Sequence, residues 1–292
     1  MDSEFLKSFV GVIHHGSIAA AARQLDLTPG AITLRVKALE KEFGAALVQR
    51  SGRTVVATEA GARVYAQAQA VLRGIEDLRG LATSPGMVGQ LRLGVISSAA
   101  SSLLPHVLRE FDALHPDAQV VIKRDSSSAL YRAVCDDLLD AAVIVEPHFG
   151  IPKSCRWQAL DKEPLILLTA SSLLAGDPHR ILARERLIRY DRNYWGSRIA
   201  EDYLYSAGIE PREYYEVNAL DNVALLVEQG LGVSLVPDWA GPWCTGRALT
   251  KHALPISGYH RTVGLLWSTS NVRHRQISDL ILCAERIVES WR

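Results

Sequence analysis

The N-terminal segment places two helix starts so close together that the chain must turn sharply between them. Ser17 opens an alanine-rich stretch, and Thr28 stands directly before Pro29 at the start of the next one. Serine and threonine cap helices through their hydroxyl oxygens, and proline suits the first helical position because the N–H that it lacks would be unpaired there anyway. The apolar spacing predicts three helices joined by tight turns, over residues 3–15, 17–25 and 29–43.

Two short helices in this arrangement, the second with outward polar and basic residues, form a helix-turn-helix, in which the second helix enters the major groove of DNA. A basic turn at 50–53 separates short extended pieces at 47–49 and 54–57, and we expect it to form a wing that reaches the DNA. Between Arg35 and Arg53 five basic residues stand against two acidic ones, which is the local charge that phosphate contact needs. The alternative is an ordinary three-helix domain with solvated charges.

A long helix is predicted from Thr58 to about Leu81, and its apolar residues recur at near-heptad spacing. These residues are Val64, Val71, Leu72, Ile75 and Leu78. The stripe has no evident partner within the chain, so we expect it to be a dimer seam. The stretch Thr83-Ser84-Pro85-Gly86 breaks the helix and is predicted to be a hinge.

Beyond the hinge, buried strands alternate with helical patterns, which predicts a mostly parallel α/β sheet with helices on its faces and two lobes. The strands are expected over 90–96, 119–123, 141–145, 165–169, 187–189, 234–236 and 262–267, and the helices over 101–115, 128–138, 197–207, 220–229 and 272–290. We therefore expect three parts, namely a DNA-binding domain over 1–58, a linker helix and hinge over 59–86, and an α/β domain over 87–292. The lobes of that domain are expected over 87–160 with 268–292, and over 161–267.

The composition is that of a globular chain, with 32 basic and 32 acidic residues and 48% hydrophobic residues. No run of about 18 apolar residues and no signal-peptide pattern is present, so we expect a cytoplasmic protein without a membrane segment. Nothing favours Cys135 or Cys155 as a redox pair over core packing. The nine histidines lack metal-ligand spacing, and no nucleophile and base are paired, so we expect no metal, no cofactor and no catalytic residues.

Four stretches carry a resemblance to a known family, namely GSIAAAARQLDLTPGAITLRVKALEKEFGAALVQRSGRTVVATEAG, LRLGVISSAASSLLPHVLREFDALHPD, LLDAAVIVEP and VALLVEQGLGVSLVP. In this order they resemble the LysR-type transcriptional regulators over essentially the whole chain. The resemblance implies a winged helix-turn-helix, a dimerising linker helix and a two-lobed effector domain like a periplasmic binding protein. It implies a bacterial regulator that binds double-stranded promoter DNA, is gated by a small molecule, and assembles as homodimers into a homotetramer. An activator of this kind would also contact RNA polymerase.

The resemblance also indicates which residues meet DNA. They are Thr28, Pro29, Gly30, Thr33, Leu34, Arg35, Lys37, Arg50 and Arg53. Relatives usually have Gln, Pro or Ser, and Arg where this chain has Pro29, Gly30 and Leu34. Leu34 cannot hydrogen-bond and could meet only a thymine methyl group. We therefore expect sequence readout to depend on Thr33, on Lys37 and on DNA shape.

Three helix starts, two of which follow predicted strands, match positions where relatives contact effectors, and free N–H groups at such starts suit anions. The candidate effector-binding residues are Ser97, Ser98, Ser127, Val145, Arg192, Trp195 and Asn218. Arg192 would pair a carboxylate, Trp195 would form an aromatic or apolar wall, and Val145 would keep part of the pocket apolar. Each serine taken singly is equally well explained as a helix cap. Two other functions stay open, namely a constitutive architectural DNA-binder and an enzyme fused to a DNA-binding domain.

Overall fold

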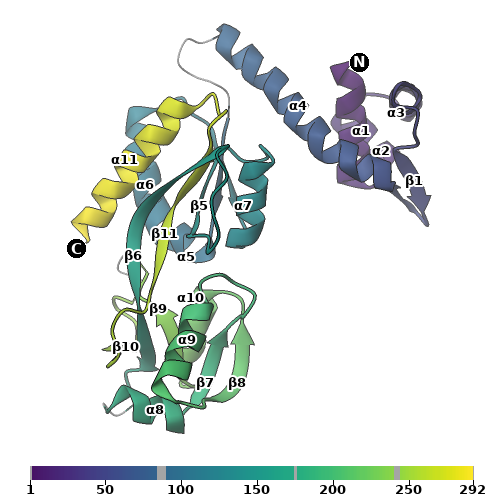
Figure 1. The fold of residues 1–292 in the computed structure, drawn as a ribbon. Coiled ribbons are helices and arrows are strands. Elements are labelled where there is room, and N and C mark those ends of the chain that lie inside the picture. The colour runs from purple at the N-terminus through teal and green to yellow at the C-terminus, as the bar shows by residue number, and fades with distance from the viewer. Residues whose placement is uncertain (1, 84–89, 174–175, 240–243, 292) are drawn as a thin grey trace. The chain divides into compact units, whose positions relative to one another are not determined.

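The chain divides into two units, Met1–Gly89 and Gln90–Arg292, which are drawn as a ribbon in Figure 1. The computed structural model describes residues 2–83, 90–173, 176–239 and 244–291. The hinge predicted around Pro85 lies outside the described residues. None of the described helices is long and apolar enough to cross a membrane.

The N-terminal unit has the three predicted helices, the predicted hairpin and the predicted long helix. Their bounds are α1 (Ser3–His15), α2 (Ile18–Gln24), α3 (Pro29–Phe43), β1 (Val48–Ser51), β2 (Thr54–Ala57) and α4 (Glu59–Thr83). The hydroxyl oxygens of Ser17 and Thr28 accept backbone N–H groups of α2 and α3, as the sequence predicts. Gly16 and Gly44 end α1 and α3 with φ of 63° and 67°, a left-handed conformation that glycine adopts without strain.

The long helix α4 is not an isolated rod, because its first turns complete the core of the N-terminal unit. That core holds the buried side chains of Phe9, Ile32 and Leu39, and Val64 and Leu72 of α4 pack against it. The prediction that the apolar stripe has no partner within the chain is therefore wrong for Val64 and Leu72. The reason is that the helical period turns one side of the stripe toward the three-helix core.

The remaining stripe residues face away from this core or lie at its margin. Val71 is 44% exposed and Leu78 is 66% exposed, while Ile75 is half-buried. Val71 and Leu78 are therefore the part of the predicted seam that has no apolar partner within the described residues of the N-terminal unit.

The C-terminal unit consists of two lobes, each built on its own hydrophobic core. The first lobe contains β3 (Leu91–Val95), α5 (Ser97–Ser101), α6 (Leu103–Leu114), β4 (Val120–Arg124), α7 (Ser127–Cys135), β5 (Ala141–Val145) and α11 (His274–Ser290). The second contains α8 (Pro178–Arg184), β7 (Arg186–Tyr190), α9 (Arg198–Ala207), β8 (Arg212–Val217), α10 (Leu220–Glu228), β9 (Ser234–Pro237) and β10 (Leu249–Ala253). Two long strands, β6 (Cys155–Ala170) and β11 (His260–Ser268), run between the lobes (Figure 1).

The main sheet is mixed rather than mostly parallel. Its strand order is β10-β6-β11-β5-β3-β4, with β9 also paired to β6, and β7 and β8 form a separate pair. Among the described residues of this unit, the parallel pairs are β3 with β4, β3 with β5, and β7 with β8, together with an isolated bridge at Leu187. The prediction of a mostly parallel sheet is wrong because β6 and β11, which run between the lobes, pair with each other in antiparallel orientation. Antiparallel strands, unlike parallel ones, do not require a crossover connection through a helix.

The pairing of β6 with β11 also moves the boundary between the lobes. Val263 and Leu265 of β11 belong to the core of the first lobe, whereas Leu165 and Leu167 of β6 belong to that of the second. Assigning the whole of 161–267 to the second lobe is therefore wrong, because β11 packs mainly in the first. The register of the pair shifts between Val263 and Gly264, at the level where the strands leave one core for the other.

Candidate functional site

A cavity of about 280 Å³ lies between the two lobes and is lined by residues of both. Six of the seven candidate effector-binding residues line it, namely Ser97, Ser98, Ser127, Val145, Trp195 and Asn218. The loops and helix starts that the sequence singles out are therefore neighbours in space.

The fold brings these residues together because β3 and β4 are parallel neighbours, so the segments after them meet at one edge of the sheet. Ser97 and Ser98 begin α5 after β3, and Ser127 begins α7 after β4. The Ser127 hydroxyl accepts the backbone N–H of Val145 at 3.1 Å, which ties α7 to the end of β5. Asn218 precedes α10 on the opposite side of the cavity, in the second lobe.

The start of α10 differs from that of α7 in a way that matters for binding. Ser126 caps α7 with its hydroxyl, but the cap residue of α10 is Ala219, and no side chain bonds the first N–H groups of that helix. Ala219 and Leu220 both line the cavity. The positive end of α10 is therefore presented to the cavity without a protein acceptor from its cap residue.

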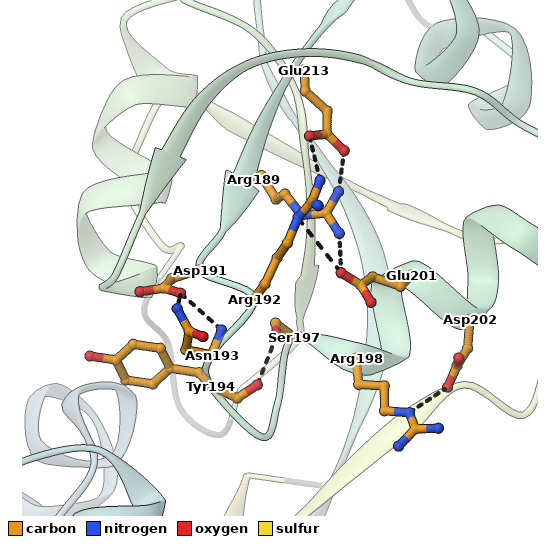
Figure 2. Close-up of polar contacts among 10 residues, drawn as sticks. All are labelled: Arg189, Asp191, Arg192, Asn193, Tyr194, Ser197, Arg198, Glu201, Asp202 and Glu213. Carbon is orange, nitrogen blue, oxygen red and sulfur yellow. Dashed lines mark hydrogen bonds and ion pairs between the residues drawn. The ribbon is translucent and has the colours of Figure 1, made fainter.

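Arg192 is not among the residues that line the cavity, so the prediction that it faces the cleft is wrong. Figure 2 shows its guanidinium directed at Glu213, with 2.8 Å between Nη2 and Oε2, and at Glu201, 3.9 Å from Nε to Oε1. Arg189 pairs with the same two carboxylates. Arg192 does pair carboxylates, as its chemistry suggests, but they are the protein's own, on β8 and α9.

Arg261 of β11 lines the cavity, although the sequence analysis does not single it out. Its Nε lies 2.5 Å from Oε2 of Glu163, and its Nη2 donates to the hydroxyl of Ser98 at 2.9 Å. The lining also includes the rings of Tyr190 and Tyr194. Burial raises the pKa of the Tyr190 phenol well above its ordinary value, so this group stays neutral at physiological pH.

Trp195 joins the lobes through an aromatic cluster beside the cavity. Its ring centroid lies 5.9 Å from that of Tyr131 on α7, and 5.9 and 5.5 Å from those of His148 and Phe149 in the segment after β5. The near-perpendicular ring arrangements are favourable ones for aromatic pairs. The loop that carries Trp195 is thus held against the first lobe.

Two cysteines that are distant in the sequence lie side by side in the first lobe. The sulfur atoms of Cys135 and Cys155 are 3.7 Å apart, and both residues are free thiols. Burial, with a further contribution from Cys135, raises the pKa of the Cys155 thiol to about 11. Cys155 is part of the hydrophobic core, as the sequence analysis expects, but no sequence pattern indicates that its sulfur atom lies close to that of Cys135.

We predict that alkylation of Cys155 by iodoacetamide is slow at neutral pH and keeps rising with pH up to about 10, since only the thiolate reacts and an ordinary thiol titrates near 8.5. The rate is measured by peptide mass spectrometry on the folded protein. The Cys135→Ala variant is the control, and its profile should move to lower pH because Cys135 contributes to the raised pKa. A rate that levels off near pH 8.5 in the unmodified chain would contradict the prediction.

The other candidate surface is formed by α3 and the β1–β2 hairpin. Seven of the nine predicted DNA-binding residues are exposed, namely Thr28, Pro29, Gly30, Leu34, Lys37, Arg50 and Arg53. Leu34 is 70% exposed, so its side chain is accessible to a thymine methyl group. Among the residues that the structure describes, Lys37, Arg50 and Arg53 form no ion pair, so their charges are available to phosphates.

Three polar groups around this surface are engaged within the protein. Arg35 lies 3.7 Å from the carboxylate of Glu4, and the hydroxyl of Thr33 donates to the carbonyl of Pro29 at 2.8 Å. The Thr33 oxygen keeps acceptor capacity, so it can still receive an amino group of a base. The carboxylate of Glu40 accepts the N–H groups of residues 47 and 48, which ties the hairpin to α3 and turns this negative charge away from solvent.

We predict that Arg53→Ala weakens binding to all duplex sequences about equally and lowers the slope of log K against log salt by about one, because one phosphate contact is lost. Fluorescence anisotropy with specific and random duplexes at several salt concentrations measures both quantities. Arg63→Ala, which removes an exposed arginine of α4 that pairs with Glu59, is the matched control. An unchanged slope for Arg53→Ala would show that the hairpin does not touch the DNA backbone.

A winged helix-turn-helix joined to a two-lobed α/β unit with an interlobe cavity defines the class of DNA-binding regulators that carry an effector domain. Residues 4–62 match the family model of the "Bacterial regulatory helix-turn-helix protein, lysR family", and residues 85–287 match that of the "LysR substrate binding domain". The chain belongs to the LysR family of bacterial transcriptional regulators. It is a DNA-binding transcriptional regulator of that family.

Similar proteins span almost the whole chain. A "Probable hydrogen peroxide-inducible genes activator" of Mycobacterium leprae is 28% identical over 94% of this chain and 92% of its own length. The "DNA-binding transcriptional dual regulator OxyR" of Escherichia coli K12 is 24% identical over 96% and 95%. Among solved structures, full-length CbnR complexed with its target DNA has a TM-score of 0.71 at 21% identity, covering 98% of this chain and 99% of that one. A full-length OxyR variant from Pseudomonas aeruginosa has a TM-score of 0.70 at 23% identity, covering 97% and 94%.

Proposed function

We propose that this regulator is gated by a small organic anion that binds in the cavity between the lobes. The observation that carries the proposal is the convergence of helix starts from both lobes, together with Arg261, around one cavity of about 280 Å³. This volume lies near the lower end of the range of ligand pockets, about 300–1,000 Å³, and suits a small metabolite.

The charges of the lining favour an anion. Two arginines, Arg124 and Arg261, and one acidic residue, Asp125, line the cavity. The ammonium group of Lys123 lies 3.8 Å from the carboxylate of Asp125 and offsets part of its charge. The uncapped start of α10 adds backbone N–H donors, which favour negative charge. Val145 and Trp195 offer apolar surface to the organic part of the ligand.

On the DNA side, we propose that α3 enters the major groove and that the hairpin contacts the backbone. The proposed contacts comprise Thr28, Pro29, Gly30, Thr33, Leu34, Arg35, Lys37, Arg50 and Arg53. Helix α4 would form the dimer seam through Val71, Ile75 and Leu78, and dimers would pair into homotetramers, as the family resemblance implies. We expect the protein to act on promoters in the cytoplasm, and to contact RNA polymerase where it activates.

One experiment addresses both halves of the proposal. Genomic fragments recovered with the protein would identify its operators, and binding to an operator would then be measured with and without a panel of carboxylates and their neutral amides. The proposal expects a carboxylate to raise the melting temperature of the protein and to change its DNA complex. A constitutive architectural DNA-binder would bind the same fragments with no response to any small molecule.

A second candidate function, a response to peroxide, is favoured by one specific observation beyond the names of the relatives. The two thiols 3.7 Å apart are near enough to form a disulfide after small movements. Peroxide would oxidise one thiol to a sulfenic acid with loss of water, and the other thiol would displace a second water to form the disulfide. The partly exposed Cys135 would react first, since Cys155 is buried and its pKa is raised.

Mass spectrometry after hydrogen peroxide treatment tests this second candidate. It expects a disulfide between the two residues and altered operator binding, both abolished in Cys135→Ser. If no disulfide forms, or if the disulfide leaves operator binding unchanged, the peroxide function is wrong and the anion proposal is unaffected.

A further inference from the structure

Arg261 occupies the point where the two lobes and the cavity meet. It lies on β11 directly opposite Glu163 on β6, and these are the two strands that run between the lobes. Arg261 and Glu163 are each only 4% exposed, and their short contact makes them a buried ion pair. This contact restricts the orientation of the Arg261 guanidinium, because a buried ion pair is favourable only while its hydrogen-bond geometry is kept.

The guanidinium of Arg261 touches both lobes. Its Nη2 donates to the hydroxyl of Ser98, which belongs to the first lobe. On the other side it packs against Gly196 of the second lobe, where an added Cβ would lie 3.2 Å from Nη1 and 3.3 Å from Cδ. Glycine at this position therefore lets the loop approach the guanidinium closely.

One nitrogen of this guanidinium is left without a protein acceptor. Nε is bound by Glu163 and Nη2 by Ser98, whereas Nη1 donates no hydrogen bond to any part of the chain that the structure describes. Arg261 is nevertheless a lining residue of the cavity. The Arg261 residue as a whole is only 4% exposed, so few water molecules can reach its guanidinium and an acceptor bound in the cavity would be favoured there.

We propose that Arg261 selects the effector by binding its carboxylate through Nη1 and Nη2, an inference that rests on the proposed function. A planar carboxylate fits two parallel N–H groups of a guanidinium, whereas a neutral amide offers only one acceptor oxygen. The ligand competes with Ser98 for Nη2, so its binding exchanges a contact between β11 and the first lobe for a contact with the ligand. Glu163 acts as a positioning residue, because it holds Nε while the other two nitrogens engage the carboxylate.

The test compares carboxylates with their amides on the full-length protein. The probes are acetate, succinate and benzoate, each paired with its amide, together with inorganic phosphate as a non-planar anion, at up to about 10 mM. Binding is followed by melting temperature and by tryptophan fluorescence, since Trp195 lines the cavity. For the wild-type chain we expect at least one carboxylate to bind and its amide to bind at least tenfold more weakly.

The variants separate charge recognition from folding. Arg261→Gln removes the cationic partner of the buried carboxylate of Glu163 and is expected to destabilise the chain, so the main variant is the double change Arg261→Gln with Glu163→Gln, which removes both charges of this pair. We expect it to fold and to lose at least tenfold in carboxylate affinity. Gly196→Ala keeps both charges and should weaken binding severalfold by displacing Nη1. Arg124→Gln, which removes the other lining arginine, should weaken binding less than the double variant does, whereas Arg198→Gln, which removes an exposed arginine outside the cavity, should stay within threefold of the wild-type affinity, about 0.7 kcal/mol.

The possible results distinguish a failure of the inference about Arg261 from a failure of the proposed gating by an anion. If a carboxylate binds the wild-type chain and the double variant equally, Arg261 does not select the effector, and the anion proposal stands. If Arg124→Gln alone abolishes binding, the selecting residue is Arg124. If phosphate binds and no carboxylate does, the cavity takes an anion of another geometry and the inference is wrong. If none of these anions binds the folded wild-type chain, both the inference and the anion proposal are wrong.

Discussion

Val71→Asp or Leu78→Asp is expected to raise the dissociation constant of the proposed dimer at least about 100-fold, because the change would place an unpaired charge in the proposed apolar seam at a cost of about 3 kcal/mol or more. Val71 and Leu78 are the exposed apolar residues of α4, and in a symmetric dimer each substitution occurs twice. Sedimentation velocity over a range of concentrations measures the change for Val71→Asp and Leu78→Asp. Operator binding should fall in parallel, while the melting temperature of each unit stays near that of the wild-type chain.

Two controls distinguish the seam from the core of the N-terminal unit. Leu72→Asp should destabilise that unit itself, since Leu72 packs against its core. Ala62→Asp places the same charge on an exposed position, on the opposite side of α4 from Val71 by the helical period of 3.6 residues, and should leave the dimer intact. Normal dimers in Val71→Asp and Leu78→Asp would place the association surface elsewhere.

Asp140→Ala is expected to lower the free energy of unfolding of the C-terminal unit by about 3–5 kcal/mol, as when one partner of a buried ion pair is removed. The buried carboxylate of Asp140 accepts the backbone N–H of Arg92 at 2.6 Å. It also accepts Nη1 of Arg273 at 2.9 Å and the amide of Asn271 at 3.0 Å. Its removal takes an acceptor from each of these donors at once. Urea denaturation followed by circular dichroism measures the change.

The matched control is an aspartate of an exposed pair. Asp202 lies 4.0 Å from Arg198, and both side chains are largely exposed (Figure 2). Asp202→Ala should therefore cost less than about 1 kcal/mol. If Asp140→Ala costs no more than Asp202→Ala, the network around Asp140 does not stabilise the unit.

The helices and strands that could be predicted from the sequence are those whose first and last residues are marked by residues next to them in the chain. The caps at Ser17 and Thr28 and the glycine at 44 place α1 to α3 to within a residue or two, because the groups that cap a helix are its near neighbours in the chain. The strands β8 and β10, the short helix α8 and the first half of β6 were missed. The sequence of β8 is REYYEV and most of it is exposed, so it lacks the alternation of a half-buried strand.

The same distinction explains the candidate site. Ser97 and Ser127 lie at helix starts that follow predicted strands, and Asn218 precedes a predicted helix, so these local patterns together with the family resemblance single the three residues out. Arg261 was missed because it lies within a strand, and only the pairing of β11 with β6 brings it beside Glu163 and the cavity. A charged residue next to the buried run of β11 was the one available signal. Arg192 was misplaced because Glu201 and Glu213, which engage it, reach it through the fold of the second lobe.

The strands β6 and β11 also bear on how the C-terminal unit comes apart. Each of the two strands connects the lobes, and β6 contributes side chains to the cores of both. Unfolding of either lobe would therefore break backbone hydrogen bonds and apolar contacts that also stabilise the other lobe. The two lobes should behave as one cooperative unit, with amides of β6 and β11 among the last to exchange with solvent. A regulator built in this way can bend between its lobes without passing through a half-unfolded, aggregation-prone state.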